Sequence, residues 1–352
     1  MKRFISLLCM CVMLGLLVLL TGCPNTTIEG EKNKSKGKVY FSFFDTVSYV
    51  YSYSGDELSV FDENCNEVSK LLEKYHRLFD IYNEYSGVTN LRTLNLNAGK
   101  EAMKVDKELI DFLLYAKELY VLTNGEMNVM MGSVLRLWHD CREMSKNPSL
   151  AKIPTTEELN EASLHTDISN LVIDEQNQTV RILDAKASID VGALGKGYAT
   201  EKAAELLRSR NALSYVLNIG GNIRTIGTKP DGSGWGTAIK DPQDSNKYAI
   251  VIDIADTSCV TSGDYERFFT VGGTKYHHII DKDTLMPSTY FSSVSIITPN
   301  SGLADALSTA LFTMSYEDGV ELVNKIGNVE VFWITRDGTK LYTEGFGDLI
   351  KK

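Results

Sequence analysis

Cysteine is scarce in this sequence, and the few cysteines are too scattered to form a disulfide framework or a metal cluster. Three of the six fall within the first 23 residues, which leaves Cys65, Cys141 and Cys259. These three are odd in number and far apart, and no C-x-x-C spacing occurs in the chain. We therefore expect them to be small, buried, apolar residues without a covalent role.

Excess positive charge is also lacking. The chain has 36 Lys and Arg residues against 46 Asp and Glu residues, a formal net charge of −10. Loss of Lys2 and Arg3 with an N-terminal leader would make it −12. Such an acidic protein lacks the electrostatic footprint of a general nucleic-acid binder, so we expect no nucleic-acid partner. An anionic ligand would need a metal ion or individually placed basic residues.

Neither common glycine-rich phosphate motif is present. The stretch Ser188–Thr200 contains three glycines, but it fits neither G-x-x-x-x-G-K-[ST] nor G-x-G-x-x-G. It follows a predicted strand at Val180–Leu183 and leads into a helical pattern. Asp190 can accept hydrogen bonds there, and Lys196 adds a cation. Such a loop can cradle an anion at a helix N-terminus, but an ordinary turn with a capping Asp and a solvated Lys gives the same pattern.

The N-terminus predicts secretion and lipid attachment. Two basic residues precede an apolar run at Phe4–Leu20, which is typical of a signal peptide. The following L-T-G-C resembles a bacterial lipobox and implies cleavage before Cys23 and acylation of its thiol; an uncleaved signal anchor is the alternative. The polar segment Pro24–Lys38 is typical of a flexible tether. We expect a signal peptide (1–22), a lipidated tether (23–38) and one domain (39–352) that is extracytoplasmic and lipid-anchored to the bacterial cell membrane.

Hydrophobic periodicity predicts an α+β fold, mainly antiparallel β-sheet layers flanked by helices. No internal repeat and no regular βαβ alternation occur, and 80–97 is predicted as loop. A glycine pair, Gly220 and Gly221, interrupts one strand pattern and predicts a bulge or a close backbone approach. Helices are expected at 64–79, 106–122, 156–162, 198–207 and 303–323. Strands are expected at 39–53 (one strand, or two around Asp45), 180–183, 215–226, 235–239, 248–254, 268–271, 276–280, 292–298 and in a closing hairpin, 329–335 with 340–343.

The predicted helix at 303–323 contains a candidate metal site. Asp305 and Thr309 are four residues apart and therefore neighbours on the face opposite its leucine stripe. A carboxylate with a hydroxyl suits Mg²⁺, which binds through few protein ligands and keeps several waters. A solvated polar face is the alternative, although alanines rather than Lys and Glu surround the pair.

A second candidate is the histidine pair His277–His278. Neighbouring residues in a strand point to opposite sides, so only one of the two can face a given pocket. A neutral histidine there could accept a proton from a hydroxyl nucleophile. Asp264, Glu266 and Arg267 could orient it or hold phosphate. A structural strand with one packed and one exposed histidine is the alternative.

Six motifs in register resemble the ApbE family of bacterial flavin transferases. They are F-D-I-Y-N-E-Y (Phe79–Tyr85), G-E-M-N-V-M-M-G (Gly125–Gly132), D-V-G-A-L-G-K-G-Y-A (Asp190–Ala199), N-I-G-G-N (Asn218–Asn222), S-G-D-Y-E-R with H-H-I-I-D (262–281), and A-D-A-L-S-T-A (Ala304–Ala310). The resemblance implies an ApbE-like, T-fold-related architecture. It also implies a Mg²⁺-dependent FAD:protein FMN transferase that attaches FMN by a phosphoester bond to Thr or Ser of a target flavoprotein and releases AMP.

The resemblance assigns roles to individual residues. It implies that Asp190 and Lys196 contact FAD, and that His278 is the histidine of the transfer step. It makes Ala193, through its carbonyl, a Mg²⁺ ligand together with the Asp305 and Thr309 side chains. It assigns Tyr82, Met127, Asn128, Val129 and Ile279 to the flavin-nucleotide pocket.

Two departures from the family pattern affect this assignment. Many members have T-M-G-T where this chain has Phe43-Phe44-Asp45-Thr46, and many have Asp at the position of Asn128. The implied partners are FAD, FMN-acceptor subunits of membrane redox complexes, and the membrane through the lipid anchor. Two alternatives remain at the level of sequence: an FAD pyrophosphatase that gives free FMN and AMP, and a non-catalytic FAD-binding lipoprotein.

Overall fold

The computed structural model describes residues 27–29, 35–244 and 246–351. The predicted signal peptide and Cys23 lie outside these residues, as do 30–34 of the predicted tether. In the described part, the sheet begins earlier than the expected domain start at Val39. Strand β2 begins at Lys36 and pairs with β1 at Thr27–Glu29. No helix in the described ranges is both long and apolar enough to cross a membrane.

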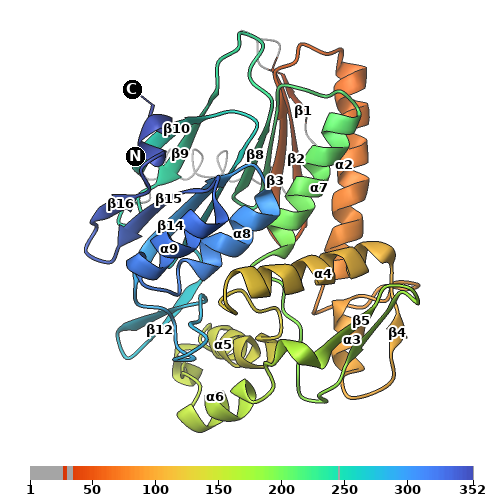
Figure 1. Ribbon diagram of the computed structural model, residues 1–352, viewed down its shortest axis with the longest axis vertical. Helices are drawn as coiled ribbons and strands as arrows, with labels where there is room; N and C mark the ends of the chain where they lie inside the picture. Colours follow the sequence, from red (N-terminus) through yellow and green to blue (C-terminus); the bar gives the residue numbers. More distant parts are fainter. Residues whose placement is uncertain (1–26, 30–34, 245, 352) are drawn as a thin grey trace, which may run out of the picture.

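A nine-stranded sheet forms the upper half of the molecule (Figure 1). All of its pairings are antiparallel. The strands, in spatial order, are β1, β2 (Lys36–Phe43), β3 (Thr46–Ser52), β7 (Tyr215–Ile219), β8 (Asn222–Ile226), β11 (Ser258–Gly263), β14 (Phe291–Thr298), β15 (Glu330–Thr335) and β16 (Lys340–Tyr342).

Strand β14 is buried along its whole length because both faces of the sheet are covered there. Val294 and Ile296 pack in a cluster with α8 (Ser301–Ala310) and α9 (Tyr316–Ile326). Ile297 points the other way, into a cluster with the hairpin of β9 (Trp235–Lys240) and β10 (Tyr248–Ile254) and with α10 (Phe346–Leu349). Alternation of side chains along one strand thus joins three layers.

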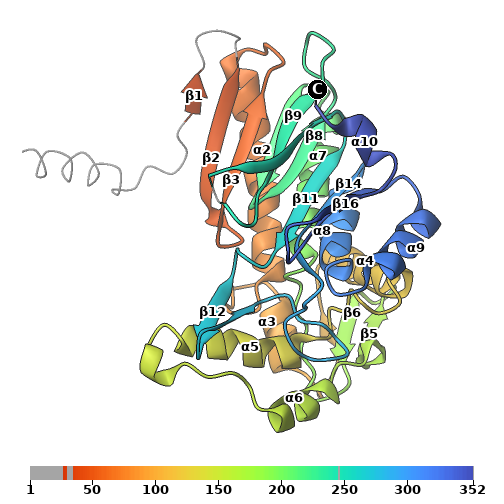
Figure 2. The ribbon, with the colours of Figure 1, turned by 90° about the vertical axis from the view of Figure 1, so that its left-hand side faces the viewer.

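Helices α2 (Leu58–Phe79) and α7 (Gly195–Ser209) cover the sheet beside α8, as Figures 1 and 2 show. Below them lie α3 (Leu91–Leu96), α4 (Lys107–Leu122), α5 (Gly132–Met144), α6 (Thr156–Ser163) and a small sheet in the order β4 (Met103–Lys104), β6 (Thr179–Ile182), β5 (Leu171–Asp174). The hairpin of β12 (Phe268–Val271) and β13 (Thr274–His277) reaches down to α5 (Figure 2). One large core cluster spans α2, α4 and α7, so the two halves share an interior.

The α+β class and the antiparallel sheet confirm the prediction, and several boundaries correct it. The expected helix at 303–323 is two helices, because Ser315 caps a new one by accepting the Asp318 N–H (3.1 Å). The apolar pattern hides this break since both helices pack in the same cluster. The expected loop 80–97 contains α3, which begins at a capping box of Asn90 and Thr93. Strands β4, β5 and β11 were not predicted.

The glycine pair forms a hairpin turn instead of a bulge within one strand. Gly220 and Gly221 have φ of 58° and 95° and join β7 to β8. A Cβ on Gly220 would lie 2.5 Å from a methyl carbon of Thr46. The predicted close approach is therefore confirmed, and the tip of the β2–β3 hairpin is its partner. Cys65, Cys141 and Cys259 are buried and unpaired, as expected.

Candidate active site

Two of the predicted pocket segments are joined by backbone hydrogen bonds. The Asp190 N–H donates to the Val129 carbonyl (2.8 Å), and the Gly132 N–H donates to the Ser188 carbonyl (3.1 Å). Gly132 permits this approach, because a Cβ there would lie 2.3 Å from the Ser188 oxygen. The segment before α5 and the loop before α7 therefore form one continuous wall.

The Asp190 carboxylate lies on this wall and keeps one oxygen available. Its Oδ1 accepts the Gly192 N–H (2.8 Å), whereas Oδ2 has no hydrogen-bond partner in the described ranges. Burial raises the pKa of the Asp190 carboxyl; the Gly192 N–H and the nearby His139 and Arg267 act in the opposite direction. A half-buried carboxylate with a free oxygen suits a donor group on a bound ligand.

Helices α7 and α8 meet at Gly197 and Asp305. The Gly197 N–H donates to Asp305 Oδ2 (2.7 Å). In a regular helix this N–H would bond to the carbonyl four residues earlier, that of Ala193. Within the described residues, the Ala193 carbonyl accepts no hydrogen bond. The Gly197 N–H thus bonds to a carboxylate from α8, and the Ala193 carbonyl oxygen is left without its usual helical partner.

Three oxygens of the predicted metal site are free of hydrogen bonds in the described part of the chain. They are the Ala193 carbonyl, Asp305 Oδ1 and the hydroxyl of Thr309, one turn after Asp305 on α8. The nearest cation is Lys196, with Nζ 3.9 Å from Asp305 Oδ1. Asp305 is only 5% exposed. A buried carboxylate with free neutral oxygens beside it fits a hard divalent cation.

No group of three or more His, Cys, Asp or Glu side chains that could hold a metal ion occurs in the ranges that the structure describes. The predicted site has one carboxylate, one hydroxyl and one carbonyl, so it rests on oxygen ligands of mixed type. Such a set leaves several coordination positions for water and for phosphate oxygens, which is typical of Mg²⁺.

A buried ion pair that the sequence did not predict fixes α8 against α7. Glu201 on α7 accepts the Ser301 N–H at the start of α8 (2.7 Å) and the Arg224 Nε–H of β8 (2.9 Å). Arg224 and Glu201 are almost completely buried. A carboxylate at a helix N-terminus also interacts favourably with the helix dipole. The sequence around Glu201 gives no sign that this residue forms an ion pair, because its partners Arg224 and Ser301 are distant in the chain.

Glu126, which the sequence did not single out, links its own motif to residues that follow two other motifs. Its carboxylate accepts the Thr313 hydroxyl hydrogen (3.0 Å) and lies 3.2 Å from Lys282 Nζ. Burial raises the pKa of Glu126, while Thr313 and Lys282 lower it. The residue precedes Met127 directly, so it ties this pocket segment to the end of α8 and to the segment after His278.

The two adjacent histidines differ as the alternation argument predicts. His277 is buried, donates from Nε2 to the Ser288 carbonyl (2.9 Å) and accepts the Ile279 N–H at Nδ1 (3.3 Å). His278 is exposed, and its Nδ1 lies 3.2 Å from the Arg267 carbonyl oxygen. A carbonyl can only accept, so the hydrogen sits on Nδ1, and Nε2 keeps its lone pair.

Neighbouring groups keep His278 neutral. Desolvation by the surrounding protein lowers the pKa of its imidazole, and the positive charges of Arg267 and Arg142 lower it further. The residue is nevertheless exposed at the protein surface. An accessible, neutral imidazole with a free Nε2 can act as a general base.

Tyr82 lies beside His139. The Tyr82 N–H donates to the Asp80 carboxylate (2.6 Å). Its ring lies 5.3 Å from the His139 ring, and its hydroxyl is 3.4 Å from Nδ1 of that histidine. The Tyr82 side chain is 50% exposed. An exposed aromatic pair is a platform on which a flat ring can stack.

The remaining predicted pocket residues are Met127, Asn128, Val129 and Ile279, and their assignment to the pocket stays a prediction. Met127, Val129 and Ile279 are buried in the hydrophobic core, so their side chains do not reach an open surface. The Asn128 amide is committed to the protein: its Nδ2 donates to the Thr166 carbonyl (2.9 Å) and its Oδ1 accepts the Met130 N–H (2.9 Å). Asn128 therefore shapes the loop.

The departure from the family pattern at Phe43–Thr46 lies at the tip of the β2–β3 hairpin. Phe44 and Asp45 both have positive φ, 53° and 50°, and form the turn. The Phe44 N–H donates to His76 Nδ1 (3.2 Å), and the two rings pack edge to face at 5.7 Å. This contact gives His76 a structural role.

Comparison with known proteins gives consistent matches over most of the chain. The model of the ApbE family matches residues 46–333. An FAD:protein FMN transferase of Treponema pallidum is 30% identical over 321 residues, covering 87% of this chain and 86% of that protein. An FAD:protein FMN transferase of Vibrio cholerae is 31% identical over 280 residues, covering 78% and 81%.

Solved structures give the same result. The crystal structure of the ApbE protein of Thermotoga maritima matches with a TM-score of 0.78 at 26% identity, over 93% of this chain and all of that one. The flavin transferase ApbE of Vibrio cholerae matches with a TM-score of 0.73 at 26% identity, over the same shares.

Proposed function

The chain belongs to the ApbE family, and we propose that it is an FAD:protein FMN transferase. Such an enzyme breaks the pyrophosphate of FAD, joins the phosphate of the FMN half to a protein hydroxyl and releases AMP. The relatives establish that the chain is a transferase enzyme. The observation that carries the proposal is His278, a neutral and accessible base within one of the shared motifs.

We assign His278 Nε2 as the acceptor of the hydroxyl proton. A threonine hydroxyl is a weak nucleophile, so its proton must leave as the new O–P bond forms. The bond from phosphorus to the AMP oxygen breaks at the same time, and its electron pair leaves with AMP. The Arg267 carbonyl holds the ring by its Nδ1–H and so aims Nε2 away from the backbone. His278 then returns the proton to solvent.

We propose that Asp305, Thr309 and the Ala193 carbonyl hold Mg²⁺. The three free oxygens support this assignment. When bound, the ion neutralises charge on the transferring phosphoryl group and on departing AMP. Lys196, beside Asp305, adds a positive charge to the same place. Asp190 offers its free oxygen to a donor group of FAD, and Tyr82 offers a stacking surface.

We also propose that the enzyme acts outside the cytoplasm, held by a lipid on Cys23, on FMN-acceptor subunits of membrane redox complexes. The L-T-G-C sequence supports the anchor. Nothing in the described residues contradicts a membrane-tethered globular domain.

The proposal is tested by mass spectrometry of an acceptor protein incubated with the tether-free enzyme, FAD and Mg²⁺. We expect a mass gain of one FMN on a threonine or serine, together with AMP in solution. Free FMN and AMP without an adduct would establish an FAD pyrophosphatase instead. Intact FAD that remains bound to the enzyme would establish a carrier and remove His278 from any catalytic role.

A further inference from the structure

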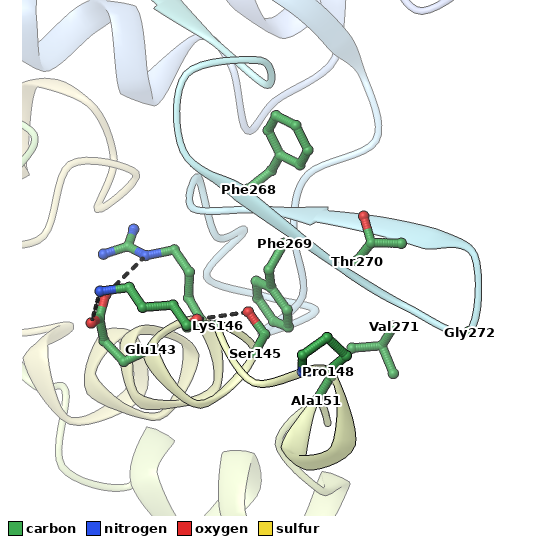
Figure 3. A pocket seen from close by; sticks show the side chains of 11 residues that line it. Glu143, Ser145, Lys146, Pro148, Ala151, Phe268, Phe269, Thr270, Val271 and Gly272 are labelled. Atoms are coloured by element: carbon green, nitrogen blue, oxygen red, sulfur yellow. Dashed lines mark hydrogen bonds and ion pairs between the residues drawn. The ribbon is translucent and has the colours of Figure 1, made fainter.

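A cleft of about 590 Å³ opens beside the candidate active site, between α5 and the β12–β13 hairpin (Figure 3). One side is formed by 142–151, the end of α5 and the segment that follows it. The other side is formed by Phe268–Gly272, which is β12 and the start of its turn. No residue of β13 lines it. The cleft therefore lies along the outer edge of β12.

That edge carries backbone groups without a strand partner. The small sheet contains β12 and β13, with Phe268 opposite His277. The His278 N–H donates to the Arg267 carbonyl (3.1 Å), so the pairs that exchange hydrogen bonds are 267–278, 269–276 and 271–274. The N–H and C=O groups of Phe268 and Thr270 consequently point away from β13, toward the cleft.

The hairpin is held in place by aromatic packing on α5. The Trp138 ring stacks on Tyr276 at 5.9 Å and lies 6.3 Å from Phe269. Its Nε1–H donates to the Leu285 carbonyl (2.9 Å). A strand edge that is fixed before binding adds a further strand at lower entropic cost than a mobile one.

The N-terminal end of β12 lies next to the proposed base, His278. Arg267, whose carbonyl holds His278, immediately precedes β12. An extended chain advances about 3.3 Å per residue. A hydroxyl one or two residues beyond a segment paired with β12 therefore comes within reach of His278.

Charge at the cleft is opposite in sign to that of the whole protein. Arg142 and Lys146 line it, and Glu143 between them lies within 4.0 Å of both cations. Arg267, at the end toward His278, has no carboxylate within 4.0 Å among the residues described. The local excess is positive, whereas the chain carries −10. An acidic segment would be attracted to this place and repelled elsewhere.

We propose that the acceptor protein docks here: an extended, acidic segment of the acceptor pairs with the open edge of β12 and presents its threonine or serine hydroxyl to His278. Backbone pairing accepts many side chains, so acceptors of different sequence can use it. The inference rests on the proposed transferase function and adds to it the place and the conformation in which the acceptor binds.

The substitution Thr270→Pro tests the pairing, because it removes one outward N–H and leaves the β13 pairing intact. Proline is tolerated at such edge positions. The probe is a flavin-free acceptor protein that the wild-type enzyme labels with FMN. We expect the KM for the acceptor to rise about tenfold, the effect of one lost hydrogen bond. FAD binding, followed by flavin fluorescence, should stay unchanged. Thr270→Val keeps the N–H and should behave as wild type.

Charge is tested separately with Lys146→Glu, a change at an exposed side chain. We expect a higher KM for the acceptor and a weaker dependence of KM on salt, with FAD binding unchanged. A wild-type KM in both Thr270→Pro and Lys146→Glu would overturn the docking site. If the variants lost FAD binding and FMN transfer to the same extent, the cleft would be part of the FAD site, and the docking proposal would also be overturned. Absence of labelling by the wild-type enzyme would instead refute the transferase, and the docking proposal with it.

Discussion

At His277 and His278 the same imidazole ring has two different environments. His277 is enclosed, and both ring nitrogens are used within the protein. His278 uses one nitrogen and exposes the other. The difference follows from strand alternation and from a single carbonyl, that of Arg267. At the residue scale, the proposed base is thus distinguished from its neighbour by the hydrogen bond that selects its tautomer.

Replacement of His278 by alanine should slow FMN transfer by about 10²- to 10⁴-fold, the usual contribution of a general base. FAD should still bind, because its other proposed contacts remain. Single-turnover transfer and flavin fluorescence measure the two effects separately. His165→Gln, which alters a histidine that pairs with Asp184, is the matched control and should keep the wild-type rate. A wild-type rate in His278→Ala would refute the assignment.

The pH dependence of transfer should reflect the environment of His278. Its pKa is lowered by desolvation and by the nearby guanidinium groups, so the base stays neutral below the ordinary value of about 6.5. The acid limb of the rate profile should therefore lie below pH 6.5. Arg267→Gln removes one positive charge, raises the pKa of His278 and should move that limb to higher pH. If the acid limb of Arg267→Gln lay at the same pH as that of the wild type, the Arg267 charge would not lower the pKa of His278.

Asp305→Ala should abolish the dependence of the reaction on Mg²⁺ and most of the activity, because it removes the carboxylate of the proposed site. Titration of the enzyme with Mg²⁺ in the presence of FAD measures the effect. Asp318→Ala, which removes an exposed carboxylate from the following helix, is the control and should titrate as wild type. Metal dependence that persists in Asp305→Ala would rule out this ligand set.

At the scale of elements, the contact of α7 with α8 brings together the residues of the proposed metal site. Gly197 lets the helices approach, since a Cβ there would lie 2.3 Å from the Asp305 Cβ and 2.4 Å from the Ser301 oxygen. The Glu201–Arg224 pair then fixes the start of α8. The site is thus defined by how two helices pack, and each helix alone carries only part of it.

Gly197→Ala should push α8 away from α7. Overpacking of this kind costs about 1–3 kcal/mol of stability. The rate of transfer should fall by more than the loss of folded protein explains, because Asp305 moves with α8. Thermal unfolding and Mg²⁺-dependent transfer measure the two effects. Gly236→Ala on β9 is the control: its nearest contact is the flexible Lys351 side chain, and it should change little. Full activity in Gly197→Ala would show that the contact tolerates expansion.

At the scale of the whole molecule, the site lies where the upper sheet with its helices meets the lower helical half (Figure 1). Its residues span Tyr82 to Thr309 in sequence, so the complete domain is needed to assemble it. The proposed lipid anchor at Cys23 precedes all of them. Anchoring and catalysis should therefore be separable.

Cys23→Ala should move the protein from the membrane fraction to the soluble fraction while transfer to a soluble acceptor proceeds at the wild-type rate. Fractionation with fatty-acid labelling measures anchoring. Cys141→Ala keeps the proposed acylation site and should stay with the membrane. A Cys23→Ala protein that remains membrane-bound with its full N-terminal mass would favour an uncleaved signal anchor.

The sequence by itself determined the fold class, most helices, the closing hairpin of β15 and β16, and the motifs that resemble the ApbE family. These depend on local periodicity, turn residues and short spacings, all of which involve residues that are close together in the sequence. It also predicted that the two adjacent histidines point to opposite sides, because alternation in a strand is a local rule.

Only the tertiary structure decided how these parts cooperate. The free Ala193 carbonyl, the Glu201–Arg224 pair, the Glu126 contacts, the role of His139 beside Tyr82 and the open edge of β12 all depend on residues distant in sequence. The break between α8 and α9 is of the same kind, since one apolar cluster serves both helices. Such features arise from packing between elements, and a local pattern carries no information about which distant group will complete it.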